Sequence, residues 1–511
     1  MSNRSLEKEL KHYFGFDTFK TGQKEIISDV MNGRDTLGIL PTGSGKSVCY
    51  QLPAMLAEGV TVVVSPLVSL MVDQVKALKA KGFKRVTAIN SFLSQEQKKQ
   101  LLSQLSHYKL VYVSPEILQN PLVKERLKTL PISLFVVDEA HCISQWGHEF
   151  RTDYLKLANV IETFNRPTVL ALSGTATPEV QKDIVTQLGM TDMESHIYAM
   201  DKENISFAIE HVEHPNEKLV KIEQLLKYQH APTMIYFSSR QWAEKASGEL
   251  SSNLPDKRVA FYHGGMEQSD RLLIQQQFMN DQLDVICCTS AFGMGIDKKN
   301  IRYVIHFHLP TQTESFIQEI GRAGRDGKHS ISVVYYSPSD DYLPKKLIQS
   351  ELPEAPDIQK TLNYLFNLYQ SGAKLPVDEL VQQELELTET QWRFIKYHCH
   401  QHHLLYQQTI VFNRDKWKDF HTFLTNQVEN RFQYKMAKFS ELISWVHRQG
   451  CRRKSLYQPF QTSLKTPVVP CCDFCGFDWK NFTFGQKEAV MIQQDWNERL
   501  RDIFLLGDKH E

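Results

Sequence analysis

A glycine-rich segment near the N-terminus carries residue types that bind phosphate. Residues 41–47 read PTGSGKS, between an apolar run at 36–40 and a helix-compatible segment at 48–52. Backbone N–H groups of such a loop can surround a phosphate while a lysine reaches its outer oxygens and a serine holds Mg²⁺. Leu40 replaces the first glycine of the usual pattern, so a plain glycine turn with a surface lysine is the alternative. The candidate nucleotide ligands are Thr42, Gly43, Ser44, Gly45, Lys46 and Ser47.

Two carboxylates follow a second apolar run. Residues 134–137 predict a buried strand, and Asp138 and Glu139 come directly after it. Because parallel sheets bind ligands at the carboxyl ends of their strands, Asp138 is expected to hold Mg²⁺ opposite Ser47. Glu139 is then expected to orient and deprotonate the attacking water. Such a pair also occurs by chance after strands, but the glycine loop upstream favours the catalytic interpretation.

A glutamine upstream of the glycine loop is a candidate for reading adenine. Gln23 follows the segment FGFDTFKTG, in which aromatic residues alternate with polar ones. Its amide can read the adenine edge, and Tyr13, Phe16 or Phe19 can supply a stacking face. The alternative is a surface glutamine beside core aromatic residues.

The second half of the α/β pattern contains two arginines three positions apart. Arg322 and Arg325 lie in the stretch QEIGRAGRDG, which begins at Gln318. We expect both on one helical face, where a permanently charged planar group can reach the γ-phosphate from another lobe. A solvated basic turn is the alternative interpretation.

Polar and aromatic residues after other predicted strands are candidates for nucleic-acid contacts. The loop at 143–151 is aromatic and contains glycine, so Trp146 or Phe150 can stack on an unpaired base while Arg151 meets a phosphate. The alternative is that Trp146 packs a hinge. Hydroxyls of Ser173 and Thr175 are expected to hydrogen-bond the Asp-Glu pair. The candidate nucleic-acid contacts are Ser65, Gln145, Trp146, Phe150, Arg151, Ser238, Arg240, His263 and Thr289.

Length and composition bound the class of protein. The 511 residues suggest three or four domains, and equal numbers of basic and acidic residues (59 each) mean that nucleic-acid binding must use local patches. No apolar run approaches the length of a membrane span, and the N-terminus does not resemble a signal peptide. We therefore expect a soluble protein of the reducing cytoplasm.

Four of the nine cysteines cluster near the C-terminus. In a reducing compartment such a cluster indicates a structural zinc site more often than disulfides. Either all four thiols ligate, or one is a spectator and His447 takes its place. The expected zinc ligands are Cys451, Cys471, Cys472 and Cys475, and the cysteines expected to pack in cores are Cys49, Cys142, Cys287, Cys288 and Cys399.

Read together, these stretches resemble the superfamily 2 helicase motor, and closely the RecQ family of DNA helicases. The resemblance covers about residues 5–345, in motif order. The stretches that carry it are YFGFDTFKTGQ, LPTGSGKS, VVDEAHCISQWGHEFRTDY, ALSGTAT, IYFSSR, YHGGM, TSAFGMGIDK and IQEIGRAGRDG.

The resemblance implies two RecA-like lobes, ATP hydrolysis with Mg²⁺, and 3′→5′ translocation on single-stranded DNA. It also implies that Trp146 lies in the loop that couples DNA to hydrolysis. Lys20 stands where the family usually has arginine, which keeps the charge but loses the planar fork. The residues that the resemblance places in the nucleotide cleft are Gln23, Lys46, Ser47, Asp138, Glu139, Gly295, Asp297, Gln318, Arg322 and Arg325.

The last third departs from the common family pattern, because about 75 residues separate the motor from the cysteine cluster. Amphipathic segments at 357–369, 377–385 and from 388, followed by a strand at 407–412, suggest an inserted winged helix. The expected fold is thus α/β: two tandem RecA-like P-loop lobes of parallel sheets flanked by helices, then a mainly helical region. The expected divisions are lobe 1 (1–204), lobe 2 (205–345), the winged helix (346–428), the zinc segment (429–480) and a helical tail (481–511), without the terminal helical domain of longer members.

These expectations define an ATP- and Mg²⁺-dependent 3′→5′ DNA helicase of recombination, repair and replication that contains structural Zn²⁺. Its expected partners are single-stranded and branched DNA with single-strand-binding and recombination proteins, and we expect a monomer. One alternative is an RNA helicase, and another is a nucleotide-gated translocase or structure-binding protein that does not separate strands. The complete set of catalytic motifs counts against a protein that only binds.

Overall fold

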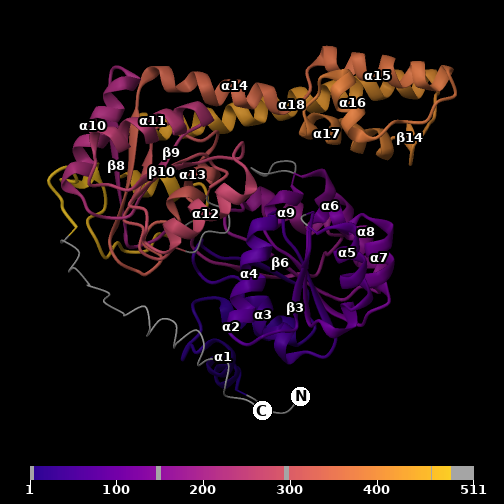
Figure 1. The fold of residues 1–511 in the computed structure, drawn as a ribbon, viewed down its shortest axis with the longest axis horizontal. Helices are drawn as coiled ribbons and strands as arrows, with labels where there is room; N and C mark the ends of the chain where they lie inside the picture. The colour runs from indigo at the N-terminus through magenta and orange to yellow at the C-terminus, as the bar shows by residue number, and fades with distance from the viewer. Residues whose placement is uncertain (1–4, 92, 145–150, 293–297, 462, 485–511) are drawn as a thin grey trace.

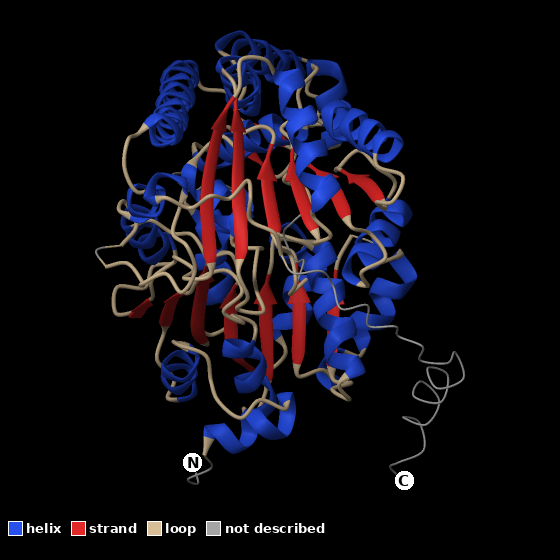
Figure 2. Cartoon of the chain, turned by 90° about the vertical axis from the view of Figure 1, so that its left-hand side faces the viewer, coloured by secondary structure: helices blue, strands red, loops and turns tan. Residues whose placement is uncertain are grey.

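The computed structural model describes residues 5–91, 93–144, 151–292, 298–461 and 463–484. Two lobes are each built around a parallel sheet, and a helical domain projects from the second lobe over the first (Figure 1). Figure 2 shows the two sheets one above the other, surrounded by helices. The predicted two-lobe α/β architecture is therefore confirmed.

Lobe 1 contains a seven-stranded sheet of order β3-β4-β2-β5-β6-β1-β7, with every pair parallel. The strand that precedes the glycine loop, β1, lies next to β6, and β6 lies next to β5, which precedes the two carboxylates. This order brings the two motifs to one edge of the sheet. The strands are β1 (Thr36–Ile39), β2 (Val60–Val64), β3 (Val86–Ile89), β4 (Leu110–Val113), β5 (Ile132–Val137), β6 (Thr168–Ser173) and β7 (Glu194–Ile197).

Helices cover both faces of this sheet. Alternate residues of a strand point to opposite faces, so Val62 and Val64 join one apolar core while Val63 joins the other. Both cores are fully buried, which explains the nearly continuous apolar runs in the sequence. The helices of lobe 1 are α1 (Leu6–Phe14), α2 (Gln23–Met31), α3 (Val48–Leu56), α4 (Val68–Ala80), α5 (Gln95–Ser103), α6 (Pro115–Leu118), α7 (Pro121–Lys128), α8 (Leu157–Thr163) and α9 (Pro178–Gln187).

Lobe 2 repeats the design with a six-stranded parallel sheet of order β10-β11-β9-β12-β13-β8. One of its faces joins the apolar core that continues from lobe 1, and the other has a core of its own. Its strands are β8 (Ile205–His211), β9 (Thr233–Tyr236), β10 (Val259–Tyr262), β11 (Val285–Cys288), β12 (Tyr303–His306) and β13 (Ser330–Tyr336). Its helices are α10 (Pro215–Tyr228), α11 (Arg240–Asn253), α12 (Gln268–Met279) and α13 (Thr313–Ile320).

Two helices form a stalk that leaves lobe 2. Helix α14 (Tyr342–Glu351) leads outwards and α18 (Arg414–His447), a continuous helix of 34 residues, leads back beside it (Figure 1). Glu351 pairs across the stalk with Arg431 and Lys435, two cations that are almost fully buried. The boundary expected at residue 428 therefore lies inside one helix.

The helical domain is inserted between the two stalk helices. It has its own apolar core, in which Trp392 and Leu365 are fully buried. Three helices and a two-stranded hairpin follow the predicted order, while the winged-helix assignment stays a prediction. The elements are α15 (Ala355–Gln370), α16 (Asp378–Leu385), α17 (Glu389–Gln401), β14 (Leu405–Tyr406) and β15 (Thr409–Ile410).

After the stalk the chain returns to lobe 2. Helix α19 (Arg452–Tyr457) and the short helix η5 (Asp473–Cys475) lie against β8, and residues 477–484 pack on the outer core of lobe 2. None of the helices in the described ranges combines the length and apolar character that crossing a membrane requires.

Candidate active site and cysteine cluster

The glycine loop joins the carboxyl end of β1 to the N-terminus of α3, as predicted. Gly43 and Gly45 have φ angles of +83° and +77°, in the left-handed region that favours glycine. A Cβ on Gly45 would come within 2.8 Å of Gln23 Nε2, so a side chain there would displace the Gln23 amide. The Ser44 hydroxyl is buried and has no hydrogen-bond partner among the described residues. The conformation of the loop therefore fits a phosphate ligand, and the Ser44 hydroxyl is available to bond it.

Two residues upstream hold this loop from outside. Gln23 Nε2 donates to the carbonyls of Ser44 (2.9 Å) and Gly45 (3.1 Å), and its Oε1 accepts from the backbone N–H of Lys20 (3.0 Å). Lys20 Nζ donates to the Gly43 carbonyl at 3.0 Å. Both side chains therefore fix the conformation of the loop. Recognition of adenine by Gln23 stays a prediction.

The lysine of the loop faces the two carboxylates across the sheet edge. Lys46 Nζ lies 3.4 Å from both carboxylate oxygens of Glu139. Asp138 is 7% exposed at the end of β5. Burial, reinforced by the neighbouring carboxylate of Glu139 and opposed by Lys46, raises the pKa of Asp138 to about 6. A buried carboxylate of this kind is stabilised in its charged form by a bound cation, as a Mg²⁺ site with Ser47 requires.

Glu139 has a backbone conformation that is uncommon outside glycine. Its φ and ψ are 48° and 49°, and its N–H donates to Asp138 Oδ1 at 3.0 Å. Tyr154 Oη donates to the Asp138 carbonyl at 3.0 Å. These bonds hold the turn in a strained geometry that turns both carboxylates towards the glycine loop, as is common at functional sites.

A histidine links the carboxylates to the neighbouring strand. His141 Nδ1 lies 2.9 Å from Ser173 Oγ and 3.5 Å from Glu139 Oε2. The expectation that Ser173 binds the Asp-Glu pair directly is therefore wrong, because His141 lies between them. Thr175 Oγ1 is buried and bonds to neither carboxylate, since no described residue is its partner. His141 was not among the expected site residues, although its position two residues after Glu139 indicates that it lies close to the carboxylates.

An arginine of lobe 2 lies against the glycine loop of lobe 1. A Cβ on Gly43 would lie 3.1 Å from Arg325 Cγ, and a Cβ on Gly321 would lie 1.8 Å from Thr42 Oγ1. A side chain at position 321 would clash with Thr42, and one at position 43 would press on Arg325. Arg325 of lobe 2 therefore lies beside the glycine loop of lobe 1, and its predicted role at the γ-phosphate stays a prediction.

The arginines do not share a helical face, which corrects the sequence expectation. Helix α13 ends at Ile320, and the chain continues through turns that contain Arg322 and Arg325. Gly324 has a φ of +55°, and a Cβ there would come within 2.3 Å of Asn204 Nδ2. A side chain at position 324 would therefore clash with Asn204, whose Nδ2 donates to the Gly324 carbonyl at 2.8 Å.

Four further residues were predicted to line the nucleotide cleft, and the structure describes two of them. Gln318 and Arg322 are 8% and 4% exposed, so both side chains are buried. Their predicted catalytic roles stay predictions. Gly295 and Asp297 lie outside the described residues.

The described DNA-contact candidates of lobe 1 are Ser65 and Arg151. Ser65 follows β2 and is buried, and its Oγ has no hydrogen-bond partner in the described ranges. Arg151 is partly exposed and pairs with Glu116 at 3.4 Å. Three further candidates lie outside the described residues: Gln145, Trp146 and Phe150.

The candidate DNA contacts of lobe 2 gather at the carboxyl ends of β9, β10 and β11, which are neighbours in the sheet. Ser238 Oγ donates to the Leu309 carbonyl at 3.1 Å, and His263 Nε2 lies 2.6 Å from Glu244 Oε1. The fold therefore brings these candidates together, while their contact with DNA stays a prediction. They are Ser238, Arg240, His263 and Thr289.

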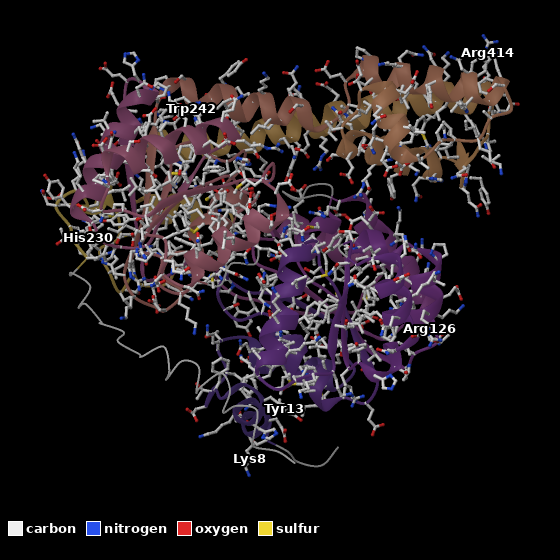
Figure 3. All side chains as sticks on the ribbon, in the orientation of Figure 1. Lys8, Tyr13, Arg126, His230, Trp242 and Arg414 are labelled. Carbon is white, nitrogen blue, oxygen red and sulfur yellow. The ribbon has the colours of Figure 1, made fainter. Side chains whose placement is uncertain are left out.

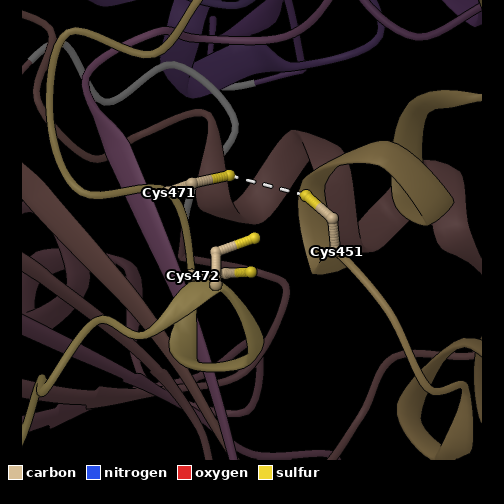
Figure 4. A group of neighbouring side chains, drawn as sticks. Cys451, Cys471 and Cys472 are labelled. Carbon is tan, nitrogen blue, oxygen red and sulfur yellow. Dashed lines mark hydrogen bonds between the residues drawn. The ribbon is translucent and has the colours of Figure 1, made fainter.

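The four clustered cysteines converge on one point. Their sulfur atoms all lie within 4.8 Å of one another, and Cys451 Sγ is 3.5 Å from Cys471 Sγ (Figure 4). Four thiols at this separation fit a tetrahedral zinc site. His447 does not belong to the group: its ring packs against His211 and meets the ring of Tyr336 edge to face. The arrangement fits ligation by all four cysteines, and the alternative with His447 is not supported.

Backbone contacts tie the cysteine cluster to lobe 2. Phe207 N in β8 donates to the Cys471 carbonyl at 3.2 Å, and Ile209 N donates to Asp473 Oδ2 at 3.1 Å. Arg453 is almost fully buried and donates to the carbonyls of residues 202 and 205. The cluster therefore caps the edge of the lobe 2 sheet. The other five cysteines are buried, as predicted for packing residues.

Comparison with known proteins identifies the family. The DEAD/DEAH box helicase model matches residues 20–184, and the helicase conserved C-terminal domain model matches residues 217–327. The probable ATP-dependent DNA helicase RecS of Bacillus subtilis is 41% identical over 505 residues, which cover 98% of each chain. The ATP-dependent DNA helicase RecQ of the same species is 42% identical over 350 residues. This chain belongs to the RecQ family of ATP-dependent DNA helicases. The alignment with RecQ covers 68% of this RecQ-family chain and 58% of that protein.

Solved structures agree with this RecQ-family fold at low identity. Mycobacterium smegmatis helicase Lhr bound to single-stranded DNA and AMP-PNP matches with a TM-score of 0.59 at 19% identity, covering 81% of this chain and 60% of that one. The DEAD-box helicase Mss116 bound to single-stranded RNA matches with a TM-score of 0.56 at 16% identity, covering 86% and 90%. At these identities the likeness concerns the fold alone.

Proposed function

We propose that this protein unwinds DNA in the 3′→5′ direction, driven by ATP hydrolysis between its two lobes. The observation that carries the proposal is the approach of Arg325 to Gly43, which assembles one nucleotide site from both lobes. Family membership supports DNA as the substrate. The polarity follows from the resemblance of the whole motif set to the family.

Each side chain of the cleft has a defined task in this proposal. Lys46 leaves Glu139 and pairs with the outer phosphates of the nucleotide, which frees Glu139 to accept the proton of the attacking water. Arg325 stabilises the charge that develops on the transferred phosphoryl group. Mg²⁺ held by Ser47 and Asp138 would supply a positive charge beside the phosphates.

Movement along DNA follows from the way the site is divided. Because Arg325 belongs to lobe 2 and the glycine loop to lobe 1, the lobes are held together when nucleotide bridges them and are released after hydrolysis. The candidate DNA contacts lie at the strand ends of both lobes, so closing and opening would shift one set relative to the other. Repeated cycles would then advance the strand.

The C-terminal third has a supporting part in this proposal. Zinc held by the four cysteines would be structural, because the cluster caps β8 and has no contact with the nucleotide cleft in the described structure. The inserted helical domain would act as a winged helix on duplex DNA. The expected partners, single-strand-binding and recombination proteins, a monomeric state and a cytoplasmic location complete the proposal.

Strand displacement on partial duplexes tests the proposal. Full-length protein is incubated, with and without ATP, with a DNA duplex that carries either a 3′ or a 5′ single-stranded tail, and with the matching RNA duplexes. We expect ATP-dependent displacement from the 3′-tailed DNA only, and none by Glu139→Gln. Displacement only from the 5′ tail contradicts the polarity, and equal displacement of RNA supports an RNA helicase. DNA-stimulated hydrolysis without displacement supports a nucleotide-gated translocase.

A further inference from the structure

A cavity of about 670 Å³ separates lobe 1 from the inserted helical domain. Its floor is the edge of lobe 1 where β2, β3 and β4 end, and its roof includes the first turns of α17 and the stalk. The volume lies within the range of about 300–1,000 Å³ typical of ligand sites. The cavity is separate from the nucleotide cleft and contains none of the residues of the glycine loop.

One carboxylate in this cavity lies between two arginines from different domains. Glu116 Oε1 is 3.4 Å from Arg151 Nη1 of lobe 1 and 3.4 Å from Arg393 Nη1 of α17. All three side chains are partly exposed to solvent, from 24% for Glu116 to 41% for Arg393. The positions of Glu116 and Arg393 are 277 residues apart in the sequence.

Arg393 is oriented by acidic neighbours on both sides. Its Nη2 lies 2.6 Å from Glu389 Oε1, one helical turn earlier on α17, and its Nη1 lies 3.9 Å from Asp153 Oδ2 of lobe 1. The bond to Glu389 holds the guanidinium at the cavity whether or not lobe 1 is in contact. The two bonds to Glu116 are longer than the roughly 2.7–2.9 Å of strong charge-assisted hydrogen bonds, so this carboxylate is the weaker and more readily exchanged partner.

We propose that Arg151 and Arg393 form a binding site for a backbone phosphate of single-stranded DNA, with the Glu116 carboxylate as its internal competitor. The DNA strand passes through the cavity, and a phosphate oxygen takes the position between the two guanidinium groups. This inference rests on the proposed function and adds to it a contact supplied by the inserted domain. The domain then closes over the strand on lobe 1 instead of acting only on duplex DNA.

A phosphodiester matches the two arginines that face each other across Glu116. Two guanidinium groups that converge on one anionic oxygen match the geometry of phosphate recognition by arginine. The hydroxyls of Ser114 and Thr390 also line the cavity, and such groups commonly bond the nucleic-acid backbone. Contacts of this kind carry no base specificity, which suits a motor that moves along any sequence.

Opposite effects of two substitutions test the proposal. Glu116→Gln and Arg393→Gln both remove the ion pair between lobe 1 and the inserted domain. If that ion pair only held the two domains together, both substitutions would change DNA binding in the same direction. If the site binds phosphate, Arg393→Gln weakens binding of a labelled single-stranded oligonucleotide and lowers the slope of log K against log salt by about 1. Glu116→Gln instead tightens binding by about twofold to fivefold, because the competing charge is gone.

A matched arginine at the far end of the same domain provides the control. Arg414 is exposed and lies at the outer tip of the helical domain (Figure 3). We expect Arg414→Gln to bind the oligonucleotide as the wild type does. Equal weakening by Arg414→Gln would show a diffuse charge effect and overturn the proposal, and so would changes of the same sign in Glu116→Gln and Arg393→Gln. Wild-type protein that fails to bind single-stranded DNA would overturn the proposed function as well, whereas wild-type binding with unchanged variants would overturn this inference alone.

Discussion

Lys46 Nζ lies 3.4 Å from both carboxylate oxygens of Glu139, so the proposed phosphate-binding lysine and the proposed catalytic base neutralise each other. The two residues are 93 positions apart in the sequence and lie in the segments that follow β1 and β5, which flank β6 in the sheet. Their mutual attraction stabilises two opposite charges at the edge of a nonpolar sheet. It also predicts that nucleotide binding must separate them.

Glu139→Gln should abolish hydrolysis while it preserves nucleotide binding. The amide cannot accept the proton of the attacking water, and loss of general base catalysis typically lowers kcat by about 10²–10⁴-fold. The measurement is DNA-stimulated phosphate release, together with binding of a fluorescent ATP analogue. Glu125→Gln, an exposed change on α7, is the matched control. Normal hydrolysis by Glu139→Gln would contradict the assigned role.

Arg325→Lys should reduce kcat strongly although the charge is retained. The lysine lacks the planar fork, and arginine fingers contribute about 10³–10⁵-fold to phosphoryl transfer. Single-turnover hydrolysis at saturating ATP measures the effect without a contribution from binding. Arg414→Lys serves as the control for the same exchange on the surface. A change confined to KM would indicate that Arg325 contributes only to ground-state binding.

Each chain should contain one zinc ion bound by the four cysteines. Elemental analysis of the purified protein measures the content, and Cys475→Ser should lower it together with the melting temperature, because the cluster is bonded to β8. Asp478→Asn, an exposed change just beyond the cluster, should leave both quantities unchanged. Full zinc content in Cys475→Ser would show that this thiol is a spectator.

Acid should destabilise lobe 2 partly through His308. Burial, assisted by the charge of Lys218, lowers the pKa of His308 to about 3 from an ordinary value of 6.5. The unfolded chain therefore binds more protons than the folded chain between these pH values, so stability is lost as pH falls through this window.

The contribution of His308 approaches about 1.4 kcal/mol for each pH unit below its unfolded value. Denaturant unfolding at pH 7 and pH 5 should therefore show a smaller loss of stability for His308→Asn than for the wild type. His214→Asn, at an exposed position before α10, is the control. An unchanged pH dependence in His308→Asn would contradict the prediction.

The strand-and-helix alternation and the chemistry of the motifs were predictable because both are local. An apolar run that ends in small polar residues predicts a buried parallel strand, and the runs before PTGSGKS and Asp138 are strands β1 and β5. The spacing of the cysteines likewise indicated a metal cluster, although it left open which atoms converge. Whether a segment forms a buried strand depends largely on residues that are close in the sequence, so predictions of this kind succeed.

The tertiary structure decided the relations between residues that are distant in the sequence. Asn204 Nδ2 fills the space that a Cβ on Gly324 would need and donates to the Gly324 carbonyl, and Ser173 lies against His141 instead of a carboxylate. No pattern along the chain encodes these contacts, since they depend on how sheets and helices pack.

The sequence by itself determined the family, the nucleotide chemistry and the four thiols, because each is carried by residue types at fixed local spacing. Only the tertiary structure decided that the inserted domain rests over lobe 1 and brings Arg393 to Glu116. The physical reason is the stalk: two packed helices, fixed by the buried pairing of Glu351 with Arg431 and Lys435, set the distance and direction of the domain from lobe 2.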